Sequence, residues 1–316
     1  MGHRLRLFFT TDVHASEVCY LKFLNAAQFY KAQVLILGGD ITGKMVVPII
    51  KQGEHGYMAE LHGSLQVVQQ DSLQKLVQTI RNSGYYPFVL DAEEFERLRE
   101  DRSRVDALFK QLMVDTVRRW VRLAEERLKD KGVKVYISPG NDDIFEIDEV
   151  LSSSDFVINP EEKVVELDGY EMITWGFVNP TPWRSPRELP EEELYRRIEA
   201  MASQVRDMRR CIYNLHCPPY DTPLDVAVRL DEQLRPVIRG GEPEMVHVGS
   251  LAVRRSIEQH QPLLGLHGHI HESRGACKIG RTLCLNPGSE YGEGLLRGAL
   301  VELEENKVRF YLLTQG

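Results

Sequence analysis

Five short apolar segments, each followed directly by a polar loop, constrain the fold of this chain more than any other feature of its sequence. They lie at residues 5–10, 34–37, 134–138, 212–215 and 263–266. Between the first two, residues 17–32 carry apolar side chains at helical spacing. The order strand, helix, strand is the signature of a βαβ unit with parallel strands. We therefore expect an α/β fold whose polar loops follow the carboxyl ends of the strands, where open α/β sheets place their ligands.

A long segment at about residues 44–132 interrupts this pattern. It predicts strands at residues 45–50, 65–68 and 85–90, with a loop at residues 53–63. A long helical pattern follows up to residue 131, with a break near Ser103. We therefore expect a single domain, residues 1–316, with an inserted, mainly helical subdomain. The insertion is a candidate cap over the site, or a candidate surface for homo-oligomer formation.

The last third of the chain returns to strands. Hairpins are predicted at residues 163–175, 276–285 and 299–313, and a helix at residues 191–208.

Composition excludes several classes of protein. The chain has 316 residues and a net charge of −8, so it lacks the basic character typical of nucleic-acid-binding proteins. No apolar run approaches the roughly 18 residues that span a bilayer, and the first residues show no long apolar leader. Neither a disulfide framework nor a cysteine-based zinc site is indicated, because the five cysteines include no CxxC pair. We expect a cytoplasmic protein that binds neither membrane nor nucleic acid.

Five short blocks with metal-ligand chemistry stand directly after predicted strands. They are Asp12-Val13-His14, Gly38-Gly39-Asp40, Gly140-Asn141-Asp142-Asp143, His216 and Gly268-His269-Ile270-His271. Each block alone is a weak signal, since an isolated histidine is more often a satisfied structural residue than a ligand. Together they form a mixed set of nitrogen and oxygen donors that suits Mn, Fe, Zn or Mg. One shared carboxylate with six further ligands describes a site for two ions about 3.5–4 Å apart.

The ordered blocks D-x-H, G-G-D, G-N-x-D, H before proline and G-H-x-H closely resemble the calcineurin-like metallophosphoesterases. The resemblance covers about residues 5–43 and 133–290, and Asn286-Pro287-Gly288-Ser289 resembles the small bacterial and archaeal phosphodiesterase branch. It implies a four-layer α/β/β/α sandwich and a cofactor of two divalent metal ions, with manganese favoured. It also implies one metal held by Asp12, His14, Asp40 and His271, and a second held by Asp40, Asn141, His216 and His269, with Asp40 as the bridge.

One position departs from the resemblance. Many family members carry histidine next to the conserved asparagine, near the leaving group, and this chain carries Asp142. An ordinary aspartate is ionised at neutral pH and is a poor proton donor. Either the pKa of Asp142 is raised in the site, or the leaving group departs with help from a metal-bound water or an arginine. Asp143 matches the family's acidic position and is expected to support the site.

The expected function is metal-dependent hydrolysis of a small phosphate ester, most specifically of a phosphodiester by a metal-bridging hydroxide. Asp142, His216 and Asp143 are the candidate catalytic residues beside the metal ligands. Family members without the histidine often favour phosphodiesters, which supports this choice. Arg184, Arg187 and Arg274 are candidates for binding phosphate oxygens, although solvated surface arginines are the simpler interpretation, and His267 is expected to be structural.

Two alternatives remain open at this point. The chain could be a metal-bound interaction scaffold without activity, but a degenerate scaffold is expected to lose ligands and all seven positions are occupied. It could also be a nuclease, which its acidic composition disfavours.

Overall fold

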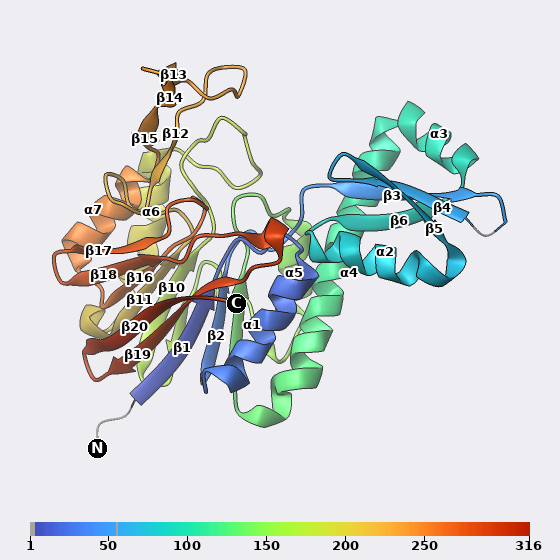
Figure 1. Ribbon diagram of the computed structural model, residues 1–316. Coiled ribbons are helices and arrows are strands. Elements are labelled where there is room, and N and C mark those ends of the chain that lie inside the picture. Colours follow the sequence, from blue (N-terminus) through green and yellow to red (C-terminus); the bar gives the residue numbers. More distant parts are fainter. Residues whose placement is uncertain (1–3, 55) are drawn as a thin grey trace.

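Two six-stranded sheets form the body of the protein (Figure 1), in a computed structural model that describes residues 4–54 and 56–316. The first sheet has the order β20-β19-β1-β2-β7-β8. Its strands are β1 (Arg4–Thr10), β2 (Val34–Gly38), β7 (Lys134–Ser138), β8 (Val157–Ile158), β19 (Arg297–Glu304) and β20 (Lys307–Gln315). The second has the order β17-β18-β16-β11-β10-β9. Its strands are β9 (Val164–Leu167), β10 (Tyr170–Trp175), β11 (Cys211–Leu215), β16 (Leu264–Leu266), β17 (Gly275–Ile279) and β18 (Thr282–Asn286).

The five predicted strands that precede the polar loops are confirmed as β1, β2, β7, β11 and β16. In the first sheet β1, β2 and β7 pair in parallel, and in the second β11 pairs in parallel with β10 and β16. Each of these strands is almost wholly buried, as expected for parallel strands covered on both faces. Their carboxyl ends therefore bring the polar loops to one edge of each sheet.

Apolar side chains alternate between the two faces of β1 and so join the sheets to the helices. Leu5, Leu7 and Phe9 belong to a buried cluster shared by the two sheets, whereas Phe8 belongs to the cluster beneath the helices. The outer helices of the first sheet are α1 (Glu17–Phe29), α4 (Arg102–Leu128) and α5 (Glu146–Ser152). Those of the second are α6 (Glu191–Ala202) and α7 (Leu251–His260).

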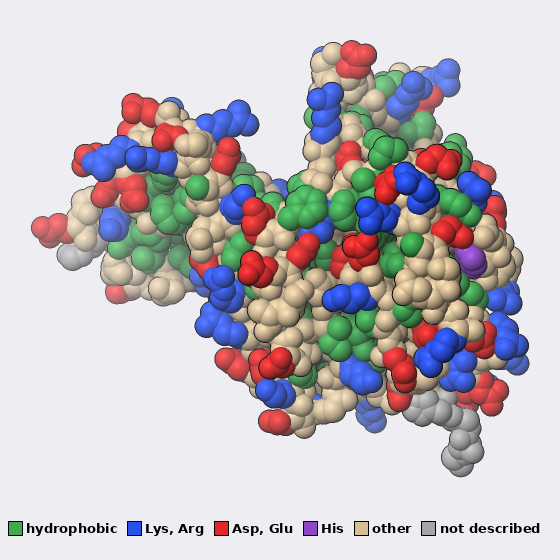
Figure 2. Space-filling model, turned by 180° about the vertical axis from the view of Figure 1, so that it is seen from behind, with side chains coloured by type: hydrophobic (Ala, Val, Ile, Leu, Met, Phe, Trp, Pro, Cys, Tyr) green, Lys and Arg blue, Asp and Glu red, His purple; other side chains and the backbone are tan. Residues whose placement is uncertain are grey.

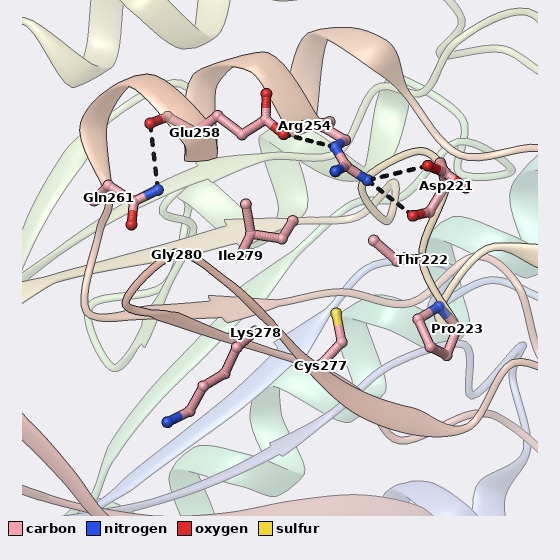
Figure 3. Close-up of a pocket in the computed structure, with 10 residues that line it drawn as sticks. All are labelled: Asp221, Thr222, Pro223, Arg254, Glu258, Gln261, Cys277, Lys278, Ile279 and Gly280. Atoms are coloured by element: carbon pink, nitrogen blue, oxygen red, sulfur yellow. Dashed lines mark hydrogen bonds and ion pairs between the residues drawn. The ribbon is translucent and has the colours of Figure 1, made fainter.

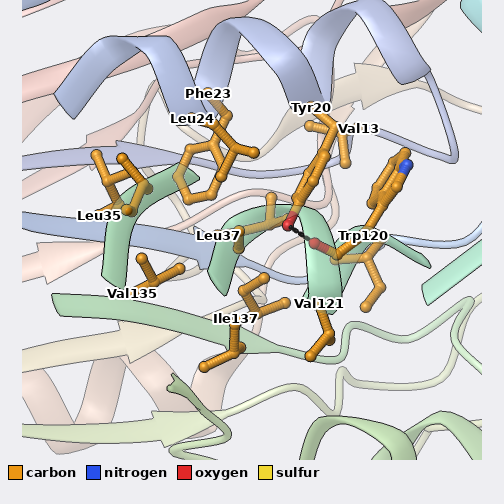
Figure 4. Packing of buried hydrophobic residues seen from close by; sticks show 14 of the residues in the cluster. Val13, Tyr20, Phe23, Leu24, Leu35, Leu37, Trp120, Val121, Val135 and Ile137 are labelled. Atoms are coloured by element: carbon orange, nitrogen blue, oxygen red, sulfur yellow. Dashed lines mark hydrogen bonds between the residues drawn. The ribbon is translucent and has the colours of Figure 1, made fainter. Parts of the chain in front are cut away.

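One contact fastens α1 to α4 on the first sheet (Figure 4). The rings of Tyr20 and Trp120 stack at 4.1 Å, and the Tyr20 hydroxyl donates a hydrogen bond of 2.7 Å to the carbonyl oxygen of Trp120. Both side chains are buried. The C-terminal half of α4 therefore belongs to the core of the body, although the sequence pattern places it in the insertion.

The insertion contains a four-stranded sheet as well as helices, and it extends to one side of the body (Figure 1). The sheet has the order β5-β4-β3-β6. Its elements are β3 (Val46–Gln52), β4 (Gly56–Leu61), β5 (Ser64–Gln69), β6 (Tyr86–Leu90), α2 (Leu73–Asn82) and α3 (Ala92–Glu100). The prediction of a loop at residues 53–63 was wrong for residues 56–61, because Tyr57, Ala59 and Leu61 alternate into a separate core under α2. The flanking residues 53–54 and 62–63 are turns, and residue 55 lies outside the described residues. The predicted helix break falls at Asp101, whose side chain caps α4 by accepting from Ser103 N.

Short strands outside the main sheets were not predicted. They are β12 (Val226–Val228), β13 (Ile238–Arg239), β14 (Glu242–Pro243) and β15 (Met245–His247), and the 3-10 turns are η1 (Gln70–Ser72), η2 (Lys129–Lys131), η3 (Met208–Arg210) and η4 (Tyr291–Glu293). The helix predicted at residues 191–208 ends earlier, at Ala202. Seen from behind, the β12–β15 projection and the insertion stand out from the body with an open hollow between them (Figure 2). Among the described residues, no helix has the length and apolar character needed to cross a membrane.

Candidate metal centre

The loops that carry the predicted ligands are tied together by backbone hydrogen bonds. Asp12 N donates to Gly39 O at 2.9 Å, and His14 N donates to Asp40 O at 3.0 Å, which joins the loops after β1 and β2. Gly268 N donates to His216 O at 2.9 Å, which joins the loops after β11 and β16. His269 N donates to Asp12 Oδ2 at 3.0 Å and so connects the two sheets. The loops thus form one rigid frame.

Two groups of three side chains converge within this frame. Ligand atoms of Asp12, His14 and His271 all lie within 4.8 Å of one another, and so do those of Asp40, His216 and His269. The groups adjoin, because Asp40 Oδ2 lies 3.7 Å from His14 Nε2 while Asp40 Oδ1 lies 3.5 Å from His216 Nε2. Asp40 therefore presents one oxygen to each group, as a bridging carboxylate would.

Asn141 approaches the same place from the loop after β7. Its amide nitrogen donates to Ser185 Oγ at 3.0 Å and to Asp142 Oδ1 at 3.1 Å. Its amide oxygen is buried and has no hydrogen-bond partner among the described residues. The side chain is thus oriented with a free acceptor, which is the atom that an asparagine offers to a cation.

The donor set fits divalent metal ions. His216 Nδ1 lies 2.9 Å from Gly38 O, which leaves Nε2 as the free ring nitrogen. That buried atom also has no hydrogen-bond partner in the described structure, although Asp40 Oδ1 lies 3.5 Å away. A second ring, that of His14, is held in the same way by Thr42 O at 3.1 Å. Hydrogen bonding of the other nitrogen is the usual arrangement of a metal-binding histidine. Buried polar atoms without partners are costly, and a cation would satisfy both Asn141 Oδ1 and His216 Nε2.

Burial and the charges of neighbouring groups act in opposite directions on the pKa values of the ligand side chains. Burial disfavours ionisation of Asp12 and Asp40, but the charge of His216 and the contacts with neighbouring histidines together outweigh it and hold the pKa of both carboxyl groups below the usual range. Burial lowers the pKa of His14 to about 3 and that of His269 to about 4. By contrast, the charges of Asp40 and Asp12 outweigh burial and raise the pKa of His216 to about 10, and Asp12 also raises that of His271. Because a histidine binds metal as the neutral imidazole, these two rings would release a proton when an ion binds.

The backbone at the site is strained. Asp12, His14, Asp40 and His269 all have left-handed φ angles, of 54°, 39°, 50° and 66°. Such angles cost free energy in residues other than glycine and are concentrated at functional sites. Close approach also explains Gly140: a Cβ there would lie 2.3 Å from Asp40 N and 2.9 Å from His216 Nε2.

Asp143 lies behind the centre and is fully buried. Its Oδ2 accepts from Gly140 N at 2.8 Å and Ile41 N at 3.0 Å, and its Oδ1 accepts from Thr42 N at 2.8 Å. The Thr42 hydroxyl adds a fourth bond. Burial, together with the charge of Asp40, raises the pKa of Asp143 to about 6. Its carboxylate therefore joins the two loops that carry Asp40 and Asn141.

Asp142 lies at the site itself and has a partner that sequence reasoning missed. Its carboxylate comes within 4.8 Å of ligand atoms of His14 and Asp40. Lys44 Nζ lies 2.6 Å from Asp142 Oδ2. Burial raises the pKa of Asp142, with the charge of Asp40 acting in the same direction. Tyr291 was also missed, and its ring packs against that of His14 at 4.6 Å. Neither residue belongs to a recognisable motif, so the sequence offered no signal for them.

The remaining candidates have structural surroundings. Arg187 is buried, donates to Asp143 O at 2.9 Å and pairs with Asp148 at 2.7 Å, so it holds the loop after β7 rather than facing solvent. Arg184 and Arg274 are exposed. His267 is buried, and its Nδ1 contacts Leu215 O at 2.8 Å, in keeping with a structural role.

The block at residues 286–289 fastens the two sheets beside the centre. Ser289 Oγ donates to Asp12 O at 2.6 Å, and Ser289 N donates to His271 O at 3.1 Å. Asn286 Nδ2 donates to Ile270 O at 3.0 Å. These bonds give a physical reason for that block: it positions the loops that carry Asp12 and His271.

A separate pocket of about 440 Å³ lies near α7 (Figure 3). Arg254 crosses it, with Nε donating to Glu258 at 2.8 Å and Nη1 donating to Asp221 O at 2.8 Å. None of the predicted ligands lines this pocket. It is therefore distinct from the candidate metal centre.

Comparison with known proteins supports the fold. No protein-family model matches the chain. MJ1162, an uncharacterised protein of Methanocaldococcus jannaschii, is 33% identical over 157 residues, which are 49% of this chain and 64% of that protein. One solved structure matches with a TM-score of 0.59 and 17% identity over 99% of both chains. The protein TT1561 of Thermus thermophilus matches with a TM-score of 0.54 and 15% identity, also over 99% of both chains.

These similarities concern the fold, since the two structures are below 25% identical and the aligned part of MJ1162 is less than two thirds of its length. Within that fold, the five blocks meet at one place in the order that the resemblance requires. The chain therefore has the α/β fold of these two structures, and its motif blocks come together within that fold as their resemblance to the metallophosphoesterases predicts.

Proposed function

We propose that this protein is a metal-dependent phosphoesterase that hydrolyses phosphodiesters at a site for two divalent ions. One observation carries the proposal: Asp40 presents one carboxylate oxygen to each of two adjoining ligand groups. Asn141 Oδ1 and His216 Nε2 support it, because neither has a hydrogen-bond partner among the described residues and a catalytic cation pair needs such donor atoms.

Seven side chains of this chain would hold the ions. Asp12, His14, Asp40 and His271 would bind one, and Asp40, Asn141, His216 and His269 would bind the other. When bound, two such ions supply Lewis-acid charge and an ionised water near neutral pH. The bonds of His14 to Thr42 and of His216 to Gly38 fix the rings before any ion arrives.

Asp142 and Asp143 would have different roles, the first beside the bound ester and the second in the loops that carry the metal ligands. Asp142 is close enough to the ligand atoms to meet the leaving-group side of a bound ester. Its position in place of the family's histidine favours a diester as substrate. Asp143, which the sequence lists among the catalytic candidates, would position Asp40 and Asn141 through its four hydrogen bonds. It is buried and does not reach the substrate.

The finer features follow from the same proposal. We infer that the arrangement is the four-layer α/β/β/α sandwich of the superfamily, with the insertion attached to one side. Manganese as the metal, a small phosphate ester as the partner, a cytoplasmic location and a homo-oligomer formed through the insertion stay predictions.

Hydrolysis of a chromogenic phosphodiester and of its matching monoester tests the proposal. Purified protein should be assayed with Mn²⁺, with chelator, and as the Asp40→Asn variant, with metal content measured in each preparation. We expect metal-dependent cleavage that favours the diester and is lost, with metal, in Asp40→Asn. A variant that keeps both metal and turnover would refute the ligand assignment. A folded wild type that binds two metals and cleaves neither ester would favour the scaffold alternative.

A further inference from the structure

We propose that Lys44 is a substrate-binding residue, whose ammonium group donates hydrogen bonds to the phosphoryl oxygens of the ester beside Asp142. The inference rests on the proposed function and deepens it, because it names a cation that neither the motifs nor the resemblance includes. It also gives the first residue of the insertion a part in the site.

Position is the first argument. Lys44 Nζ lies 2.6 Å from Asp142 Oδ2, and that carboxylate lies among the ligand atoms of His14 and Asp40. The positive charge of Lys44 also disfavours protonation of His271, which belongs with His14 to one of the two metal-binding groups. The ammonium group is therefore at the mouth of the centre. It does not lie at a remote surface.

The backbone that carries Lys44 is held firmly. Thr42 N donates to Asp143 Oδ1 at 2.8 Å, and Gly43 N donates to the hydroxyl of Tyr86, on β6, at 2.7 Å. A Cβ at Gly43 would lie 2.3 Å from Gly84 O, so this segment is also pressed against the end of α2. The insertion and the Asp40 loop together place Lys44, although its side chain remains 51% exposed.

Hydrogen-bonding capacity is the second argument. An ammonium group has three donors, and within residues 4–54 and 56–316 the acceptor that Lys44 meets is the Asp142 carboxylate. A half-exposed ion pair of this kind adds little to stability. Two donors remain for a ligand at the open face, and the acceptors that a phosphate ester offers are anionic oxygens, which form strong charge-assisted bonds with lysine.

Charge balance at Asp142 is the third argument. An ionised carboxylate at this position would repel an anionic ester, and Lys44 neutralises that charge. Loss of Lys44 would therefore have two effects: it would remove an attractive contact and expose a repulsive one. Both effects are larger for a monoester, which carries up to two negative charges, than for a diester, which carries one.

The test uses the full chain loaded with Mn²⁺ and four variants. Lys44→Met removes the charge, Lys44→Arg keeps it, and Lys44→Met/Asp142→Asn removes the repulsion as well. Lys51→Met is the matched control, because Lys51 is an exposed lysine of the same insertion, on β3. Two readouts are needed: kcat/KM for a chromogenic diester and monoester, and binding of inorganic phosphate by titration calorimetry.

We expect Lys44→Met to lower kcat/KM for the diester by about 10- to 100-fold, the size of one hydrogen bond to a charged group. The loss should be larger for the monoester, and phosphate binding should weaken by a similar factor. Lys44→Arg should retain most of both, and Asp142→Asn in the Lys44→Met background should recover part of the loss. Metal content and thermal stability should match those of Lys51→Met.

Failures of the two proposals are distinguishable. If the wild type cleaves neither ester but binds phosphate in a manner that depends on Lys44, the proposed function fails and the Lys44 site stands. If the wild type is active and Lys44→Met equals Lys51→Met in both readouts, the Lys44 site is refuted and the proposed function stands. A uniform loss that includes bound metal would also refute it, since Lys44 would then be a structural residue.

Discussion

Replacing Asp143 with asparagine is the sharpest structural test of the centre. The carboxylate accepts four hydrogen bonds at distances between 2.6 and 3.0 Å, two on each oxygen. Asparagine offers a single oxygen, so its amide nitrogen must face two donors in either orientation. The less costly orientation points the amide nitrogen towards Thr42. The Thr42 hydroxyl can then rotate to accept a hydrogen bond from this nitrogen, so only Thr42 N loses its partner.

The magnitude follows from this count. A buried donor without a partner costs about 1–3 kcal/mol, and the two bonds that remain lose the extra strength of a charged acceptor. We therefore expect Asp143→Asn to lower the free energy of unfolding by about 2–5 kcal/mol. Denaturant unfolding at pH 7.5, with chelator present, measures this loss without a contribution from bound metal. The pKa of Asp143 is raised to about 6, so the wild-type carboxylate is ionised at that pH. Because folding disfavours that charge, its removal offsets part of the loss and places the expected value at the lower end of this range.

Thr42→Val is the matched control, because it removes one donor of the four and keeps Thr42 N in place. Its expected cost is about 1 kcal/mol. If Asp143→Asn unfolds within about 0.5 kcal/mol of the wild type, or if Thr42→Val costs as much, the argument from donor count is refuted.

Three further predictions concern single residues around the site. The Glu161 carboxyl group is buried, which raises its pKa from 4.5 to about 8. Folding therefore favours the neutral form of Glu161. The contribution of this group to the free energy of unfolding is full below pH 4.5 and is lost as the pH rises through 8. Glu161→Gln should therefore flatten the pH profile of unfolding and gain at most about 5 kcal/mol over the wild type above pH 8, and an unchanged profile would contradict the burial argument. Gly140→Ala should weaken metal binding at least 100-fold in a Mn²⁺ titration, because the added Cβ would lie 2.3 Å from Asp40 N; normal affinity would show that the two loops can separate. Arg187→Met should cost about 1–3 kcal/mol of unfolding free energy, since it leaves two carbonyl oxygens without this donor, whereas Asp148 is 36% exposed and can be solvated. Arg187→Lys should not restore the loss, because one ammonium group cannot reproduce the planar guanidinium contacts; full rescue by lysine would contradict this.

The sequence predicted the parallel strands and their polar loops well, because the spacing of apolar residues and the residue types of the loops are local properties of the chain. Asp12, His14 and Asp40 could be proposed as ligands because each follows a short, mostly apolar strand. Their left-handed backbone could not be foreseen, since nothing local favours φ of 54° at Asp12.

Other features depended on contacts between distant segments. Strand β4 was missed because its neighbours Gly53 and Gly63 resemble loop signals, and only the core under α2 shows why Tyr57 points inwards. Lys44 was missed because lysine is usually solvated and because its partner, Asp142, lies nearly a hundred residues further along the chain. Tertiary packing decides such positions.

Strand β1 lies between β2 and β19 in the first sheet, and this order has a consequence for biosynthesis. A nascent chain that has emerged as far as β2 can pair one edge of β1, but the other edge waits for residues 297–304. Ser289, which bonds Asp12 O, is also made late. Domains generally fold as units during synthesis, and here the loop that carries Asp12 gains its bonds from His269 and Ser289 only after the C-terminal segments leave the ribosome. We therefore expect the ions to be acquired after translation of these strands, by a chain that has already closed its first sheet.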